Sequence, residues 1–86
     1  MVSQPKPYME IYNLTHHDKC WLLKQDGYGI RANYGESKET ATRDAAALVQ
    51  KSKQPAALRI HHQNGTLEEE RIFPGQIEDR QVSQPS

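Results

Sequence analysis

The sequence lacks three features that would each point to a class of protein. It has a single cysteine among its 86 residues, Cys20, so no disulfide can form within the chain. It has no long apolar run of the kind that a signal peptide or a membrane-spanning helix requires. Its eleven basic and eleven acidic residues cancel, and the sequence pI is about 6.9. We therefore expect a soluble, cytoplasmic protein with a reduced thiol and no contact with membranes.

Apolar residues are also scarce, which limits the size of the core. Only 35% of the residues are hydrophobic, and the mean hydropathy is -0.92. Such a chain can bury one layer of side chains, between a helix and one face of a sheet. We expect a single domain over residues 8–75, with a flexible lead-in over 1–7 and a disordered tail over 76–86, because both ends lack a usable apolar period.

One segment, residues 37–53, has the periodicity of an amphipathic helix. Its small and apolar residues form one narrow stripe: Ala41, Ala45, Leu48, Val49 and Ser52. Ser37 is the expected N-cap, with a hydroxyl that would accept from the amide of Glu39 or Thr40, and Pro55 limits any continuation. So short a helix is not stable alone, and it needs a sheet to cover.

The segments before the helix are predicted to form three strands. The first spans residues 8–15, where either Met9 and Ile11 or Tyr8, Tyr12 and Leu14 face the core. The next two, 19–25 and 28–34, flank Asp26-Gly27, a pair typical of two-residue hairpin turns. That turn would pair Leu23 with Ile30 and Trp21 with Ala32 on the buried face, and would put Leu22, Arg31, Cys20 and Asn33 on the other face.

A second hairpin is predicted after the helix, over residues 56–62 and 67–73, with Asn64-Gly65 in its turn. The expected pairs on the helix-facing side are Ala56 with Phe73, Leu58 with Arg71, Ile60 with Glu69 and His62 with Leu67. The expected pairs on the opposite side are Arg59 with Glu70 and His61 with Glu68. The predicted order is therefore β-β-β-α-β-β, an α+β fold with one mainly antiparallel sheet and a single helix packed on one of its faces.

The landmarks in this order are familiar as a set. They are an early strand tryptophan (Trp21), a short hairpin, an alanine-rich helix from Thr40 to Val49, the stretch LRIHHQNG and the charged strand EEERIF. Between Asp18 and Phe73 the chain resembles a bacterial domain of unknown function, family 2188. The recurring elements of that family are structural, namely the tryptophan, the helix alanines and the glycine of the last hairpin. The resemblance therefore implies a fold and no activity.

The histidines and the cysteine are the residues that could carry chemistry. Neighbours in an extended strand point to opposite faces, so His61 and His62 cannot both bind one ion, and His16-His17 shows no metal-ligand spacing either. A nucleophilic Cys20 paired with His16 or His17 would lack an orienting third group. We therefore expect no metal, no cofactor and no enzymatic activity.

The uncovered face of the sheet is the candidate binding surface. Its predicted binding residues are Leu22, Lys24, Arg31, Arg59, His61 and Ile72, with Glu68 and Glu70 among them and Tyr12 as a further candidate. Apolar residues on an uncovered face, and the free backbone groups of an edge strand, suit a protein partner or a second copy of the chain. The sequence thus favours an interaction module, with a homodimer as one form of it. The alternative is a nucleic-acid-binding module that uses Lys24, Arg31 and Arg59.

Overall fold

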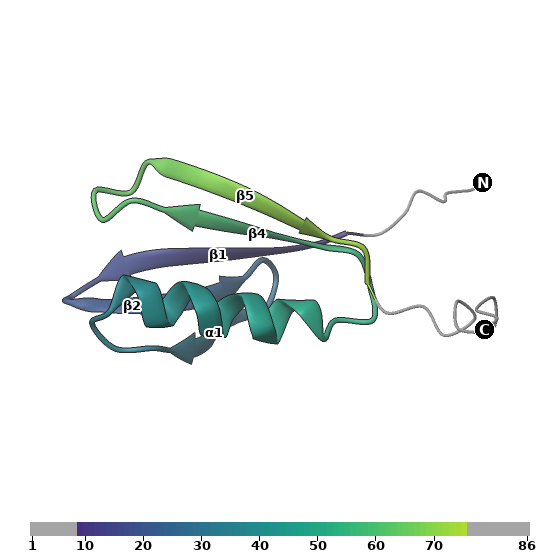
Figure 1. The fold of residues 1–86 in the computed structure, drawn as a ribbon, viewed down its shortest axis with the longest axis horizontal. Coiled ribbons are helices and arrows are strands. Elements are labelled where there is room, and N and C mark those ends of the chain that lie inside the picture. The colour runs from purple at the N-terminus through teal and green to yellow at the C-terminus, as the bar shows by residue number, and fades with distance from the viewer. Residues whose placement is uncertain (1–8, 76–86) are drawn as a thin grey trace, which may run out of the picture.

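The computed structural model describes residues 9–75 as one sheet of five strands and one helix (Figure 1). In chain order, the elements are β1 (Glu10–His17), β2 (Cys20–Gln25), β3 (Gly29–Asn33), α1 (Lys38–Gln50), β4 (Ala56–His61) and β5 (Leu67–Phe73). The expected lead-in over 1–7 and tail over 76–86 lie outside the described residues, as does Tyr8. The predicted order of strands and helix is confirmed.

The sheet is mixed, with the strand order β3-β2-β1-β4-β5. The two central strands, β1 and β4, are parallel, while the other three pairings are antiparallel. Parallel neighbours need a long crossover, and here the chain makes it through β2, β3 and α1. The α+β class with one helix is therefore confirmed, and the sheet combines both kinds of pairing.

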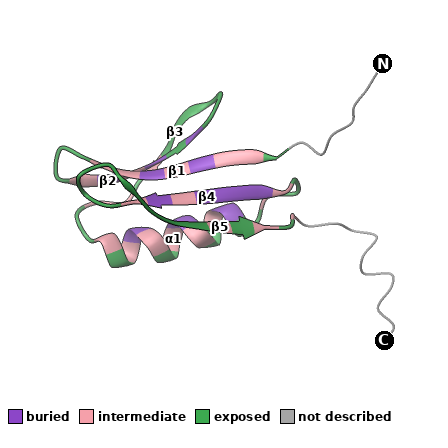
Figure 2. Ribbon diagram, turned by 90° about the horizontal axis from the view of Figure 1, so that it is seen from above, coloured by how far each residue is buried: buried purple, intermediate pink, exposed green. Residues whose placement is uncertain are grey.

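The core is one layer of side chains between α1 and the sheet. The helix contributes Ala41, Ala45 and Val49, and β1, β2 and β4 contribute larger side chains, namely Tyr12, Leu14, Trp21, Leu23, Leu58 and Ile60. Buried residues follow α1, β1 and β4, whereas β3 and β5 are largely exposed (Figure 2). Of the two alternatives for the first strand, the structure has Tyr12 and Leu14 facing the helix. Tyr12 therefore belongs to the core and not to the uncovered face.

The helix begins as predicted and ends three residues earlier than predicted. The amide of Thr40 donates to Ser37 Oγ at 3.2 Å, which makes Ser37 the N-cap. At the other end, the Lys51 amide bonds to the carbonyls of Leu48 and Val49, and Ser52 lies beyond the last helical residue. Ser52 Oγ then bonds to the backbone of Gln54 and holds the turn that leads into β4.

The first hairpin has a register different from the predicted one. Gln25 pairs with Gly29 instead of Tyr28, and the Tyr28 amide donates to the Gln25 carbonyl at 2.9 Å, so the loop has three residues instead of two. Gly27 and Gly29 both adopt positive φ, 87° and 93°, which glycine tolerates at little cost. The pair Asp26-Gly27 predicted the hairpin correctly, but it did not predict the length of the loop.

A β-bulge at Arg31 shifts the pairing between β2 and β3 by one more residue. Leu23 pairs with Ala32, not with Ile30, and the Trp21 carbonyl accepts from the Tyr34 amide at 2.9 Å. The two predicted pairs on the buried face were therefore wrong, although Trp21 and Leu23 are buried as expected. Ile30 pairs with Lys24 instead and is 61% exposed on the face away from the helix.

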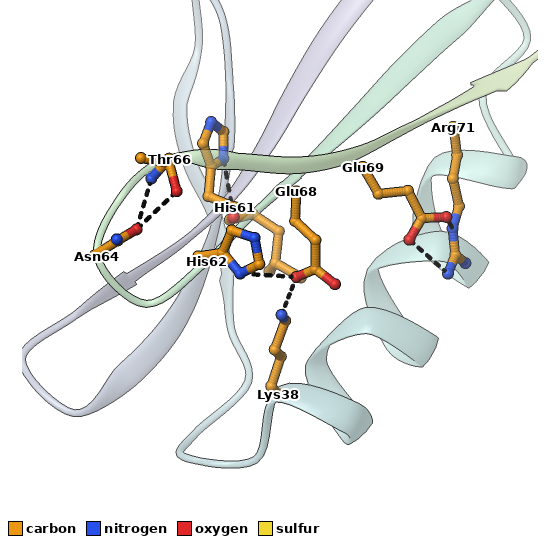
Figure 3. A network of polar contacts seen from close by, with 9 residues as sticks. Lys38, His61, His62, Asn64, Thr66, Glu68, Glu69 and Arg71 are labelled. Carbon is orange, nitrogen blue, oxygen red and sulfur yellow. Dashed lines mark hydrogen bonds and ion pairs between the residues drawn. The ribbon is translucent and has the colours of Figure 1, made fainter.

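The second hairpin keeps its predicted register until a bulge at its loop end. Four pairs are confirmed, namely Ala56 with Phe73, Leu58 with Arg71, Arg59 with Glu70 and Ile60 with Glu69. The pairs His62 with Leu67 and His61 with Glu68 were wrong, because the bulge pairs His61 with Leu67. Glu68 turns toward the helix, where it forms an ion pair with Lys38 and lies 3.6 Å from His62 Nδ1 (Figure 3).

Candidate interaction surface

The face of the sheet that points away from α1 carries no covering layer (Figure 2), and we call it the open face. A polar row crosses this face along the register of the five strands and consists of Ile30, Lys24, Asn13, Arg59 and Glu70. A second row lies toward the β1–β2 turn and contains Leu22, Thr15, His61 and Leu67. A third row, toward the other end of β1, contains Ile11, Ala57 and Ile72, with Asp26 at its β2 end.

The charges of the polar row are partly neutralised within the chain. Arg59 Nε lies 2.9 Å from Glu70 Oε2, and Asn13 Nδ2 donates to Asp26 Oδ1 at 3.3 Å. Arg59 and Glu70 are each about two-fifths exposed, so this pair contributes little to stability. Lys24 is exposed, and its ammonium group has no hydrogen-bond or ion-pair partner among residues 9–75. It is therefore the charge on this face that a ligand could use.

Within residues 9–75, the exposed aliphatic side chains of the strands lie on the open face, at its margins. Ile30, Leu67 and Ile72 are 61%, 54% and 57% exposed, and all three come from the edge strands β3 and β5. The half-buried Leu22 lies between them on β2. By contrast, the outer surface of α1 within the described range carries no exposed large apolar side chain. The uncovered side of the sheet is thus more apolar than the solvent side of the helix.

Five of the six predicted binding residues lie on the open face: Leu22, Lys24, Arg59, His61 and Ile72. The Nδ1 atom of His61 is 3.2 Å from the Leu14 carbonyl oxygen, which ties that ring to the backbone of β1. The sixth, Arg31, differs from the expectation. As the extra residue of the β3 bulge, it turns to the helix side and donates to Gln25 Oε1.

The partner of Arg31, Gln25, is the centre of a polar cluster that sequence reasoning missed. Gln25 is buried, accepts from Arg31 and donates to Glu10, which also accepts from the Tyr12 hydroxyl at 3.3 Å. Burial, and then the nearby Glu10 carboxylate, raise the pKa of Tyr12 above 10.0. The available signal was the alternation of Trp21, Leu23 and Gln25, which assigns the glutamine to the buried face.

A groove lies on the opposite side of the sheet, between α1 and β5. This groove has a volume of about 740 Å³ because the helix packs on β1, β2 and β4 and leaves β5 uncovered (Figure 1). Its walls carry Lys38 and Arg43 from the helix and Glu68, Glu69 and Arg71 from β5. Sequence reasoning missed it, because the bulge that turns Glu68 toward the helix has no simple sequence signal.

Four charged groups of the groove form two ion pairs, Lys38 with Glu68 and Arg71 with Glu69 (Figure 3). Lys38 bonds to Glu68 and holds the pKa of that carboxyl below its ordinary value of 4.5. Arg71 Nε donates to Glu69 Oε2 at 2.8 Å, which raises the pKa of the guanidinium. Because these four charges satisfy one another, the charged groups of the groove that remain for a ligand are Glu39 and Arg43, the latter 3.5 Å from Asp44.

The histidines lie apart from one another. His16 contacts the Trp21 ring edge-on at a centroid distance of 4.9 Å, His61 bonds to β1 and His62 approaches Glu68. Within residues 9–75, no three histidine, cysteine, aspartate or glutamate side chains gather where they could hold a metal ion. Cys20 is half-buried at the start of β2. No helix in the described part of the chain has the length and apolar character needed to cross a membrane.

Comparisons with known proteins agree with this picture of a fold without an assigned chemistry. The model of a family described as an uncharacterized protein conserved in bacteria, DUF2188, matches residues 11–73. That range runs from β1 to the end of β5 and includes every element of the sheet and the helix. No curated protein and no solved structure gives a significant match. The chain belongs to the DUF2188 family of uncharacterised bacterial proteins.

Proposed function

We propose that this chain is a non-enzymatic protein-interaction module and that the open face is its contact surface. The observation that carries the proposal is the position of Ile30, Leu67 and Ile72, which expose more than half of their surface on the one side of the sheet that has no covering layer. Ile72 adjoins Ala57 and Ile11 across the register, so it belongs to a continuous apolar row, and exposed apolar groups that lie together on one face mark interaction sites.

The physical gain from covering this face comes from its aliphatic side chains. Burial of apolar surface contributes roughly 25 cal/mol per Å², and an isoleucine or leucine that is half exposed still has much of that free energy to gain. The polar row lies between the row that contains Leu22 and the row that contains Ile72, and it would orient a partner, because polar groups at an interface contribute more to specificity than to affinity. The open face therefore combines a driving force with a means of selection.

The alternative function, nucleic-acid binding, has less support. Of its three cations, Arg31 bonds to Gln25 on the helix side, and Arg59 is paired with Glu70. Lys24 alone remains available, and one cation releases too few counterions for appreciable binding to a phosphate backbone. Addition of single-stranded and duplex oligonucleotides at low salt tests this alternative directly, because binding would have to weaken steeply as salt is added.

The proposal is tested by comparing the proteins that immobilised wild-type and variant chains retain from a bacterial lysate. Leu22→Lys introduces a charge at the centre of the open face without disturbing the core, since Leu22 is only half-buried. The matched control is Ala47→Lys, which makes the same kind of change at an exposed position of α1. We expect a protein, either another species or the chain itself, that wild type and the control retain and Leu22→Lys loses. Equal retention by all three would contradict the proposal.

A further inference from the structure

We infer that the occupant of the open face is a second copy of this chain, packed face to face about a two-fold axis that runs along the strands midway between β1 and β4. This inference rests on the proposed function, because it names the partner of the same surface. In such an isologous contact both molecules use the same surface, so the open face must be complementary to itself. The register of the strands allows that requirement to be checked residue by residue.

The axis follows from the strand order. Rotation about a line between β1 and β4 exchanges those two strands, and it brings β2 of one copy over β5 of the other. Because the axis is parallel to the strands, the rotation leaves the position of each residue along the strand direction unchanged. Each cross-strand row therefore meets the same row of the second copy. Face-to-face sheets pack with their strands within about 30° of each other, which keeps the rows in contact near the axis.

The charges of the polar row match under this rotation. Lys24 on β2 comes to lie opposite Glu70 on β5 of the second copy, and the symmetry makes that contact twice. Asn13 comes to lie opposite Arg59 in the same way. Lys24, which has no partner in the described part of the single chain, would thereby gain a carboxylate. An axis placed on β1 would instead bring Lys24 over Arg59, so the charges select the axis between the two central strands.

The neighbouring row matches in apolar character at its two ends, while at its centre Thr15 of β1 comes to lie opposite His61 of β4. Leu22 on β2 comes to lie opposite Leu67 on β5 of the second copy, again twice. Leu22 is half-buried and Leu67 is 54% exposed, so both have surface left to bury. The row therefore provides two apolar contacts beside two charged ones, which is the mixture found in interfaces between molecules that also exist apart.

The edge of β5 offers a second copy a less favourable contact. Two β5 strands paired edge to edge would bring Glu68, Glu69 and Glu70 close to the same three residues of the other copy. Charged side chains on an edge strand are a common protection against such pairing. The acidic edge thus disfavours self-association through β5.

The size of the open face predicts a weak dimer. Under this rotation β3 has no counterpart, so four strands overlap; at about 4.8 Å apart, about six residues long and about 3.3 Å per residue, they cover roughly 400 Å² in projection. A stable interface of standard size buries about 800 Å² on each partner. We therefore expect an equilibrium of monomer and dimer whose position changes with concentration in the micromolar to millimolar range.

Charge reversal at Lys24 and Glu70 tests both the partner and the axis. Lys24→Glu alone places two pairs of carboxylates in contact, and Glu70→Lys alone places two pairs of ammonium groups in contact. Each variant should raise the dimer dissociation constant by roughly tenfold or more, since like charges in an interface repel. An equimolar mixture restores both opposite-charge contacts in the heterodimer. Sedimentation equilibrium, with native mass spectrometry to identify the heterodimer, should find it at close to wild-type affinity.

Lys53→Glu reverses an exposed charge outside the open face and serves as the control, which should associate like wild type. Circular dichroism of each variant checks that the fold is retained. A wild-type chain that stays monomeric up to millimolar concentration overturns the inference, and so does a mixture that associates no better than its components. If the chain is monomeric and Leu22→Lys still loses a retained protein, the proposed function stands without the second copy. If neither effect occurs, both fail.

Discussion

The Nζ atom of Lys38 lies 5.7 Å from the centre of the Trp21 ring, so a cation from the first turn of α1 lies over the largest side chain of the core. Such a contact contributes about 0.5–1 kcal/mol at an exposed site. The same ammonium group bonds to Glu68 of β5 and thereby joins the helix to an edge strand that it does not cover. Lys38 is thus the residue through which helix, core and edge strand are connected.

The pair of Lys38 with Glu68 predicts a pH dependence of stability. The hydrogen bond from Lys38 lowers the pKa of Glu68 in the folded state, so its stabilising effect is complete above pH 4.5 and is lost as the pH falls through the folded-state pKa. Lys38→Met removes both the bond to Glu68 and the contact with Trp21. The loss of the Trp21 contact lowers the unfolding free energy equally at every pH, so it does not affect the pH dependence. The difference in unfolding free energy between neutral and acid pH should therefore be smaller in this variant than in wild type.

This difference is measured by urea unfolding, followed by the fluorescence of the single tryptophan. Lys53→Met, which removes an exposed lysine away from Glu68, is the control and should unfold like wild type at both pH values. An acid destabilisation that is equally large in wild type and Lys38→Met would show that the pair does not stabilise the fold.

Leu22 and Leu23 are neighbours on opposite faces of β2 and give a matched test of which face is the core. Leu23 is completely buried, so Leu23→Ala should destabilise the fold by about 2–5 kcal/mol, a large part of the total stability of so small a domain. Leu22→Ala on the open face should cost roughly 1 kcal/mol or less in the monomer. Thermal unfolding in dilute solution compares the two, and similar losses at both positions would contradict the assignment of the faces.

Tyr12 predicts a loss of stability at alkaline pH. Its pKa is raised in the folded state, mainly by burial and then by Glu10, so the neutral phenol stabilises the fold below pH 10.0. That contribution disappears as the pH rises through the folded-state pKa. Tyr12→Phe should therefore lose less stability than wild type between neutral and alkaline pH. Tyr34, whose pKa is also raised by burial, leaves part of the alkaline loss in place.

Unfolding midpoints in urea at neutral and alkaline pH check this prediction. Tyr28→Phe changes a tyrosine that is 65% exposed in the hairpin loop and provides the control, with an expected alkaline loss equal to that of wild type. Equal alkaline losses in wild type and Tyr12→Phe would mean that Tyr12 ionises as easily in the folded chain as in the unfolded one.

Alanine substitutions at Gly75 and Gly65 distinguish the cost of backbone strain from the cost of a steric clash. Both have positive φ, 88° and 99°, so alanine should cost about 1 kcal/mol at either position. A Cβ atom at Gly65 would meet no atom within 4 Å, whereas one at Gly75 would lie 2.8 Å from the Lys53 carbonyl oxygen. Gly75→Ala should therefore lower the unfolding free energy clearly more than Gly65→Ala. Equal effects would contradict the close approach of residue 75 to the connection between α1 and β4.

Local patterns predicted the elements of this fold because each depends on short-range physics. The stripe of alanines, the Ser37 cap and the two glycine turns act within a few residues, and the structure confirms the helix and both hairpins. The parallel pairing of β1 with β4 depends on contacts between distant segments, for which the sequence carries no local signal.

The errors in the predicted surface come from bulges. One extra residue at Arg31 turns that side chain toward Gln25, and one at Glu68 turns that carboxylate toward Lys38. A prediction from the alternation of side chains assumes that every residue of a strand is paired regularly. A bulge breaks this assumption, because its extra residue turns to the other face, and the sequence around it does not reveal this. Leu22, Lys24, Arg59 and Ile72 lie outside the irregular positions, and their expected face is the observed one.

The most direct test of the central claim, that the chain meets a second copy through the open face, is an amide NMR spectrum of the labelled protein at increasing concentration. We predict that the amides of Leu22, Lys24 and Ile72 shift progressively, while those of Arg43 and Ala47, which line the groove between α1 and β5, do not. Shifts confined to α1 and the groove beside β5, or a spectrum that does not change up to millimolar concentration, would contradict the claim.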